Sequence, residues 1–344
     1  MSNILIIRVS AIGDVAMTIP VLYSVAKAHP QDTFTVLTQT SLLPLFIHQP
    51  QNVKAIGMDA KTTEKSFFKF IQFILRLRAY NFDRVIDLHS VIRSWIVDFI
   101  FRLQGKPVFK INKHRNAGKR FTARPPKKIF QLRSVSDRYA DVFKAAGFRF
   151  DVQFVSLFDK YPVDETVMKE MAGDKTGRWI GIAPFARHKG KRYPIEKMEK
   201  IIEVLSGRNE TTLFLFGDRG DERKILHRWE NTFCHTVNCS GRFSLEQELL
   251  LMSRLDLMVS MDSANMHLAS LAGIKVLSIW GATHPFSGFY GYNQRLDLAV
   301  QTDLACRPCS IYGDKRCYRN DWACMYSITS EQVVDKINQY LDAL

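Results

Sequence analysis

Residues 259–285, VSMDSANMHLASLAGIKVLSIWGATHP, decide the fold of this chain. An apolar strand ends at Asp262 and Ser263, where a helix is predicted to begin, and His267 lies in the first turns of that helix. A second apolar strand follows at 275–280. Ligands of doubly wound α/β sheets bind where the strands end, and a helix N-terminus offers free N–H groups to a diphosphate. The stretch therefore predicts a nucleotide-diphosphate site in the second half of the chain.

Length and composition predict a two-domain enzyme without a membrane span. With 344 residues, of which 46% are hydrophobic, the chain has enough apolar material for two cores. No run of about 18 uncharged apolar residues, which a transmembrane helix requires, is present. The apolar part of the N-terminus is too short for a signal peptide and is typical of a first β-strand. We therefore expect a cytoplasmic protein.

Strand-like and helix-like segments alternate along the chain, with a break near residues 158–177. Strict alternation predicts a parallel sheet with helices on both faces, and two such series predict two Rossmann-like domains facing across a cleft. We expect an N-terminal domain at 1–160 with a basic insertion and a C-terminal domain at 175–328 with a four-cysteine loop. The final helix, at 329–344, is amphipathic and able to pack back across the junction.

The net charge of +14 is unevenly distributed. No acidic residue lies between Asp98 and Asp137, and this basic block predicts an anionic partner, with a solvated loop as the alternative. Nucleic acid is not expected, because the block has few aromatic residues and no recognition motif. The basic residues of the block are Arg102, Lys106, Lys110, Lys113, Arg115, Lys119, Arg120, Arg124, Lys127, Lys128 and Arg133.

The first predicted strand–helix junction, residues 8–20 (RVSAIGDVAMTIP), has one glycine, Gly13. A dinucleotide fingerprint needs three glycines, and a phosphate loop needs Gly-Lys-Ser/Thr, so neither motif is present. Asp14 lies in the first helical turn at the carboxyl end of a strand. Its carboxylate either caps the helix through a favourable interaction with the helix dipole or acts as a general base. The residues alone favour the capping role.

Two stretches together resemble glycosyltransferase family 9, the bacterial heptosyltransferases. ILIIRVSAIGDVAMTIP resembles the N-terminal motif of that family, and MDSANMHLASLAGIKVLSIWGATHP resembles its donor-site motif. The resemblance covers nearly the whole chain. It implies a GT-B fold, with an acceptor-binding first domain and a nucleotide-sugar-binding second domain. It also implies inverting transfer of a heptose from ADP-heptose to the lipopolysaccharide inner core, with Asp14 as the general base.

The resemblance also implies which residues bind the nucleotide sugar. In the basic loop at 184–194 (PFARHKGKRYP), Lys191 matches the lysine that contacts the donor phosphate. Family members often carry hydroxyl residues where this chain has Ala186 and Arg187; here Arg187, Lys189 and Arg192 either replace those contacts or are solvated. Glu222 matches the acidic residue that binds the donor ribose in the family, and we prefer it to Asp221 for this role. The remaining donor residues implied are Asp262, Ser263 and His267.

For the acceptor, the resemblance points to basic residues in the first half of the chain. Lipopolysaccharide inner cores carry carboxylates and phosphates, which arginine binds well. The expected acceptor residues are Arg115, Lys119, Arg120 and Arg138. The same block suits peripheral contact with the anionic cytoplasmic face of the inner membrane. No cofactor is required, because a lysine and a helix N-terminus can stabilise the leaving diphosphate.

Four of the six cysteines form a compact pattern, Cys306-x2-Cys309-x7-Cys317-x6-Cys324. The spacing is compatible with a structural zinc site, with two disulfides or with reduced thiols. A cytoplasmic protein disfavours disulfides, and only one CxxC pair is present where a zinc ribbon has two.

Three other functions fit the same residues. One is a transferase of the same family with a different nucleotide sugar or acceptor. Another is a non-catalytic protein that binds a nucleotide or a glycolipid, and the third, which is less favoured, is a nucleic-acid-binding protein driven by the basic block. Turnover of a nucleotide sugar separates these readings, since only the transferases consume it.

Overall fold

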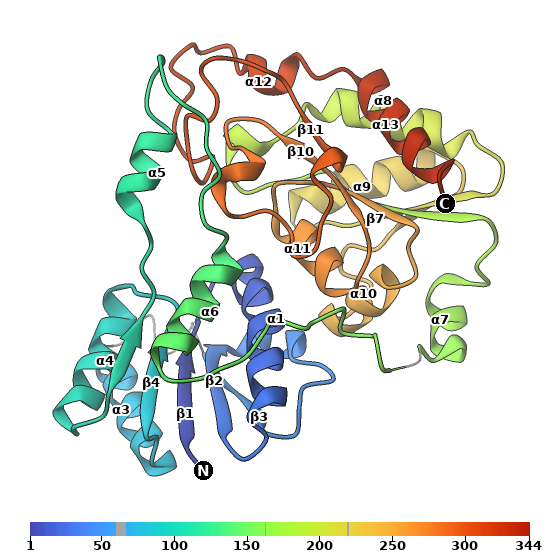
Figure 1. The fold of residues 1–344 in the computed structure, drawn as a ribbon. Coiled ribbons are helices and arrows are strands. Elements are labelled where there is room, and N and C mark those ends of the chain that lie inside the picture. The colour runs from blue at the N-terminus through green and yellow to red at the C-terminus, as the bar shows by residue number, and fades with distance from the viewer. Residues whose placement is uncertain (60–66, 162, 219) are drawn as a thin grey trace. The chain divides into compact units, whose positions relative to one another are not determined.

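The computed structural model describes residues 1–59, 67–161, 163–218 and 220–344 (Figure 1). These residues form two compact units, Met1–Lys113 with Val135–Val155 and His114–Ser134 with Ser156–Leu344. Each unit contains a parallel sheet with helices on both faces, which confirms the predicted α/β class. Among the described residues, no helix is both long and apolar enough to cross a bilayer.

The first unit is built on a five-stranded parallel sheet in the order β3-β2-β1-β4-β5. Its elements are β1 (Asn3–Ile7), α1 (Ile12–Ala28), β2 (Thr33–Gln39), η1 (Thr40–Leu45), β3 (Val53–Met58), α3 (Phe67–Leu77), η2 (Arg78–Tyr80), β4 (Arg84–Asp87), α4 (Ile92–Leu103), β5 (Val108–Lys110) and α6 (Val135–Ala145). Leu5 and Ile7 of β1 pack with α3 and α4 on one face. Phe34 of β2 packs against Phe143 of α6 on the other. Because both faces are buried, the strands are nearly continuous apolar runs.

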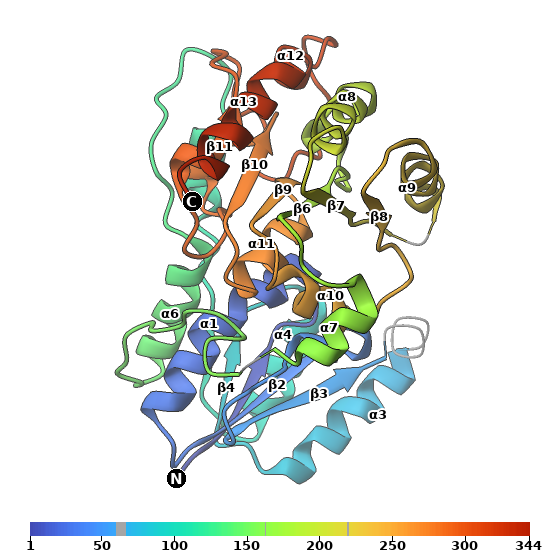
Figure 2. The same cartoon turned by 90° about the vertical axis from the view of Figure 1, so that its right-hand side faces the viewer.

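The second unit has a six-stranded parallel sheet in the order β11-β10-β9-β6-β7-β8. Its elements are α5 (Arg115–Phe121), α7 (Glu165–Ala172), β6 (Arg178–Ala183), η3 (Lys189–Lys191), α8 (Ile195–Ser206), β7 (Thr211–Leu215), α9 (Asp221–Thr232), β8 (Thr236–Asn238), α10 (Leu245–Met252), β9 (Leu257–Met261), α11 (Ala264–Leu271), β10 (Val276–Trp280), η4 (Pro285–Ser287), η5 (Leu296–Leu298), β11 (Ala299–Gln301), α12 (Ala323–Tyr326) and α13 (Ser330–Leu341). Val333 and Ile337 of α13 share a core with Ile201 of α8, so the last helix packs on α8 (Figure 2).

The basic segment at His114–Ser134 packs on the second unit, although the sequence suggested that it belongs to residues 1–160. The fully buried Phe121 ring contacts the ring of His284 edge to face at 5.9 Å. The N–H of Leu132 donates to the Phe286 carbonyl at 2.9 Å. The ammonium group of Lys127 donates to the carbonyl oxygens of Cys306 and Pro308. These contacts, which basic residues alone do not reveal, assign the segment to the second unit.

Two buried carboxyl groups tie α4 to the sheet of the first unit. Asp87, at the end of β4, accepts hydrogen bonds from two N–H groups of the following loop and from the Ser94 hydroxyl, each at 2.8 Å. Asp98 of α4 is 1% exposed and forms an ion pair with Lys110 of β5, with 2.6 Å between nitrogen and oxygen. Burial, followed by the charge of Asp87, raises the pKa of Asp98 to about 7, although Lys110 opposes the shift.

This raised pKa predicts a pH-dependent stability. Because folded Asp98 holds its proton to a higher pH than the unfolded chain does, the stabilisation is complete below about pH 4 and is lost as pH rises through about 7. Since one pKa unit corresponds to about 1.4 kcal/mol, the loss should be measurable by unfolding. Asp98→Asn should flatten this dependence in urea unfolding across that range, whereas Asp151→Asn, at an exposed position of the same unit, should not. Equal slopes for wild type and Asp98→Asn would contradict the raised pKa of Asp98.

Candidate functional site

Each sheet has a switch point, where the strand order reverses and the loops from two adjacent strands diverge. In the first unit it lies between β1 and β4, and in the second between β6 and β9. Ligands of doubly wound sheets bind at such points, beyond the carboxyl ends of the strands. The sequence-predicted residues Asp14, Lys191 and Asp262 follow β1, β6 and β9, so each lies at the switch point of its own unit.

In the first unit, Arg8 and Asp14 form a partly buried ion pair. Arg8 directly follows β1, and its guanidinium also donates to the Leu88 carbonyl beyond β4 at 2.8 Å and lies over the Tyr139 ring. Burial lowers the pKa of Arg8, but Tyr139, Asp14 and Asp87 outweigh that effect and the net shift is upward. The cation therefore holds the Asp14 carboxylate in one orientation. The side chain of Asp14 remains 27% exposed, which leaves it accessible to a substrate.

His89 lies in the loop after β4, near the same pair. Burial, followed by the positive charge of Arg8, lowers its pKa to about 4, so the imidazole is neutral at physiological pH. Its buried Nδ1 makes no hydrogen bond to any described residue. Sequence reasoning missed Arg8, Asp87 and His89. Their position at or just after the ends of β1 and β4 was the available signal, since those strands flank the switch point.

In the second unit, Lys191 and Asp262 form an ion pair at 2.8 Å between Nζ and Oδ2. Their side chains are 16% and 3% exposed. Lys191 ends the short helix η3 in the loop after β6, and Asp262 directly follows β9. The close approach of Gly313, where a Cβ would lie 2.6 Å from the Lys191 side chain, confines the lysine stem. The pair thus places one buried cation at the switch point.

The rest of the basic loop is held by its own arginine. Arg192 donates from Nε to the Ala186 carbonyl at 2.7 Å and from Nη2 to the Arg187 carbonyl at 3.1 Å. The ammonium group of Lys189 lies over the Trp322 ring, 5.6 Å from its centre. Arg192 and Lys189 therefore have structural contacts, while Arg187 is exposed.

The start of α11 adjoins the same pair. Ser263 is the extended N-cap residue, and no side-chain hydrogen bond caps the helix there. Its hydroxyl lies 3.2 Å from that of Ser260. His267, one turn into α11, is 7% exposed. A helix start of this kind can hold an anionic group through its N–H groups.

Glu222 lies in the first turn of α9, which follows β7, the neighbour of β6. Its carboxylate accepts the N–H of Asp218 at 2.9 Å and thereby orders the loop before the helix. Asp221 instead points into solvent, where its hydrogen bond to Lys224 lowers its pKa. Of the two acids, Glu222 is the one tied to the edge of the sheet.

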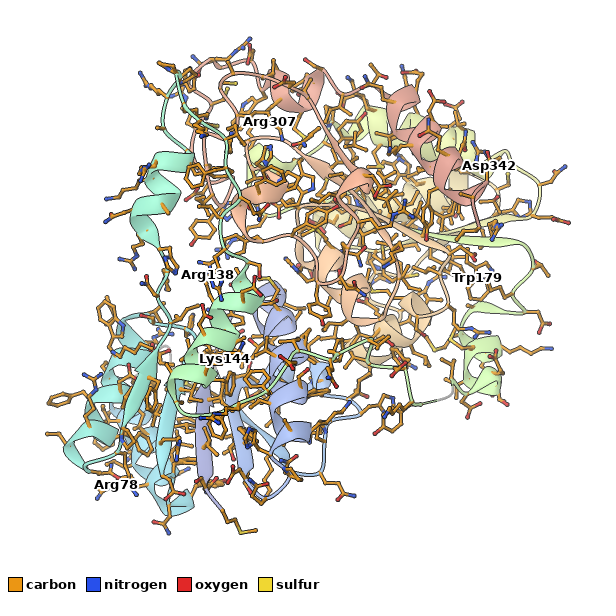
Figure 3. The ribbon with its side chains drawn as sticks, viewed as in Figure 1. Arg78, Arg138, Lys144, Trp179, Arg307 and Asp342 are labelled. Carbon is orange, nitrogen blue, oxygen red and sulfur yellow. The ribbon has the colours of Figure 1, made fainter. Side chains whose placement is uncertain are left out.

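The four expected acceptor residues are divided between the two units. Arg115, Lys119 and Arg120 are exposed on α5 in the second unit. Arg138 belongs to α6 of the first unit, is 9% exposed and donates to the Lys113 carbonyl at 3.4 Å (Figure 3). Arg138 is therefore held by a backbone contact, whereas the three residues of α5 are exposed.

The four clustered cysteines line one small pocket, and all are free thiols. Burial raises the pKa of Cys309, and it raises that of Cys324 to about 11. Buried Arg307 lies beside them and donates to the carbonyl oxygens of Gly281 and Thr283 (Figure 3). Nowhere in the described ranges are three or more His, Cys, Asp or Glu side chains arranged to hold a metal ion. The geometry gives no support to the zinc interpretation of the spacing.

Solved structures share the fold of this chain. E. coli ADP-heptose lipopolysaccharide heptosyltransferase II has a TM-score of 0.74 at 18% identity, with 99% of both chains covered. E. coli heptosyltransferase WaaC with ADP-2-deoxy-2-fluoro heptose has a TM-score of 0.69 at 18% identity, covering 98% of this chain and 99% of that one. These likenesses confirm the predicted GT-B fold with two parallel-sheet α/β domains.

Sequence comparison identifies the family. The lipopolysaccharide core heptosyltransferase OpsX of Haemophilus influenzae is 23% identical, over 82% of this chain and 80% of its own length. The sequence model of glycosyltransferase family 9 (heptosyltransferase) matches residues 70–317. That match covers more than half of the chain, and the protein therefore belongs to glycosyltransferase family 9.

Proposed function

We propose that this glycosyltransferase moves a heptose from ADP-heptose to the lipopolysaccharide inner core with inversion at the anomeric carbon. Family membership and the names of the similar proteins support the heptose and the acceptor. The observation that carries the donor assignment is the buried Lys191–Asp262 pair at the switch point of the second sheet. A nucleotide sugar presents its diphosphate as a dianion, which suits a buried cation beside a helix start.

The proposed reaction is a single displacement. A hydroxyl oxygen of the acceptor attacks the anomeric carbon of the heptose, and its proton passes to the Asp14 carboxylate. The bond from the anomeric carbon to the diphosphate oxygen breaks, and ADP leaves with that electron pair. Arg8 holds the Asp14 carboxylate, so the accepting oxygen is already oriented. Neutral His89 adds no second positive charge near the base.

The leaving diphosphate gains negative charge as the bond breaks, and fixed positive groups stabilise that charge. In this proposal Lys191 supplies the cation, and Ser263, His267 and the first N–H groups of α11 contact the phosphates and the sugar. Asp262 keeps Lys191 in place, and Glu222 binds the ribose hydroxyls. No metal cofactor is needed for these steps.

Arg115, Lys119, Arg120 and Arg138 are the proposed contacts for anionic groups of the acceptor. Because the acceptor is a glycolipid, the proposal includes peripheral contact with the anionic cytoplasmic face of the inner membrane. The alternative is a family member that uses another nucleotide sugar. Buried Ala186 and exposed Arg187 are the reason to test this alternative, since family members often carry hydroxyl residues at these two positions.

A panel of nucleotide sugars tests the donor. With purified inner-core acceptor, ADP-heptose should be consumed and ADP released, while UDP- and GDP-sugars should give less than about one hundredth of that rate. Faster turnover of another nucleotide sugar would show that this sugar, and not ADP-heptose, is the donor, while the protein would still be a transferase. ADP binding without turnover of any sugar would favour the non-catalytic alternative.

Asp14→Asn tests the general base. The change keeps the side-chain size and an oxygen for Arg8, so the fold should persist while turnover falls about 10²- to 10⁴-fold, the usual contribution of a general base. ADP affinity, measured by calorimetry, should stay unchanged. Asp137→Asn, at another first-turn helix acid in the same unit, is the matched control and should turn over normally. Turnover of Asp14→Asn within threefold of wild type would exclude Asp14 as the base.

Lys191→Met tests the diphosphate contact. It should weaken ADP binding about 10- to 100-fold, but it also leaves the Asp262 carboxylate buried without its ion pair, which destabilises the fold. The double variant Lys191→Met/Asp262→Asn removes that unpaired charge, so its melting temperature should recover while ADP binding remains weak. Lys189→Met, in the same loop, should bind ADP as wild type does. Wild-type ADP affinity in the stable double variant would contradict the assignment.

A further inference from the structure

Helix α4 exposes a row of large apolar side chains. Ile92, Phe99 and Leu103 are 72%, 61% and 72% exposed, and Trp95 is 45% exposed. Spacings of three and four residues place all of them on one side of the helix. The other side, including Phe101, is buried against the sheet. The helix is therefore apolar on both sides, whereas a surface helix normally presents polar residues to water.

Helix α3 adds to this surface. Phe68 and Leu75 are 70% and 46% exposed and lie two helical turns apart, on one side of α3. Both helices pack on the same face of the sheet, since Ile74 and Phe101 belong to one core cluster. We call the exposed side chains of these two helices the apolar face; its members are Phe68, Leu75, Ile92, Trp95, Phe99 and Leu103.

Basic residues accompany the apolar face. Lys69, Arg76, Arg78, Arg93 and Arg102 are exposed on α3, η2 and α4, and Arg78 is labelled in Figure 3. The one acidic residue within these three elements is Asp98, which is buried against Lys110. The described parts of α3, η2 and α4 therefore present positive charge and apolar area, with no exposed carboxylate of their own.

This combination determines the kind of partner. A second copy of the chain would bring two positive faces together, which repel each other. An anionic bilayer instead offers negative headgroups to the arginines and a shallow apolar layer to the aromatic and aliphatic side chains. Tryptophan beside arginine is typical of side chains at a membrane interface. In contrast, the basic segment His114–Ser134 exposes a single large hydrophobic side chain, Ile129, and so has charge without an apolar anchor.

We propose that the apolar face binds the surface of an anionic bilayer, with its apolar side chains at the boundary between headgroups and acyl chains. The inference deepens the proposed function, on which it rests, because a glycolipid acceptor would be met at that surface. It places the anchoring contact on α3 and α4 of the first unit rather than on the basic segment of the second.

Vesicle flotation of the full-length protein tests this proposal. Wild type should float with vesicles containing phosphatidylglycerol and much less with pure phosphatidylcholine vesicles. Ile92→Ser/Phe99→Ser/Leu103→Ser should lower the partition coefficient at least about tenfold, because three interfacial apolar side chains are lost. The matched control is Val204→Ser/Leu296→Ser/Tyr326→Ser, at side chains of the second unit that are 49%, 52% and 55% exposed, and it should float as wild type does.

Tryptophan fluorescence gives a second readout. Trp179, Trp229 and Trp280 are buried, and the partly buried Trp322 belongs to the second unit, away from α4 in the sequence. Vesicle binding should therefore shift chiefly the emission of exposed Trp95 to shorter wavelength. Trp95→Phe keeps an apolar side chain, so the variant should still float, yet it should lose most of that shift. The proposal would be overturned if the α4 triple variant floated as wild type does. It would also be overturned if flotation were lost only in the variant Arg115→Gln/Lys119→Gln/Arg120→Gln. A change in oligomeric state without any vesicle binding would assign the face to a second copy instead.

A soluble assay separates this proposal from the proposed function. With a deacylated, water-soluble inner-core acceptor, the α4 triple variant should transfer heptose at the wild-type rate, because none of its changed residues lies at the proposed site. Absence of transfer by wild type in this assay would refute the heptosyltransferase function and leave the flotation result standing. Loss of transfer by the triple variant alone would show that α4 acts on catalysis and would overturn its role as a membrane anchor.

Discussion

The pairing of buried charge is the constraint on which both units depend. A lysine or arginine taken out of water needs a carboxylate or several carbonyl oxygens as partners, or its burial becomes too unfavourable. Arg8 meets that condition by joining the loop after β1 to the loop after β4. Lys191 does so by joining the loop after β6 to Asp262 after β9. The same contacts fix the Asp14 carboxylate at the switch point of the first sheet and the Lys191 ammonium group at that of the second.

The excess positive charge of the chain therefore has several separate uses. Arg307 and Lys127 are internal donors that hold backbone carbonyls of the second unit. Lys191 is paired at the candidate donor site, and the exposed arginines of α3 and α4 accompany apolar side chains. A net charge alone does not distinguish these uses, because each depends on burial and on neighbouring oxygen atoms.

Long periodic segments were predictable from the sequence, since their spacing is set by the burial of one face. The strand expected at 275–280 is β10, and the final helix expected at 329–344 contains α13. Short elements such as α5 and β5 were missed, because they form through contacts distant in sequence. Asp14 and Lys191 could be predicted from motifs. Arg8 and His89 lie at strand ends but were not singled out, since their importance lies in pairing and burial that only the fold creates.

A crystal structure of the protein with ADP bound would test the donor assignment most directly. The β-phosphate should lie about 3 Å from Lys191 Nζ and from an N–H group at the start of α11. The ribose hydroxyls should contact Glu222. A diphosphate bound elsewhere in the second unit, or in the first unit, would contradict the placement of the nucleotide at the β6–β9 switch point.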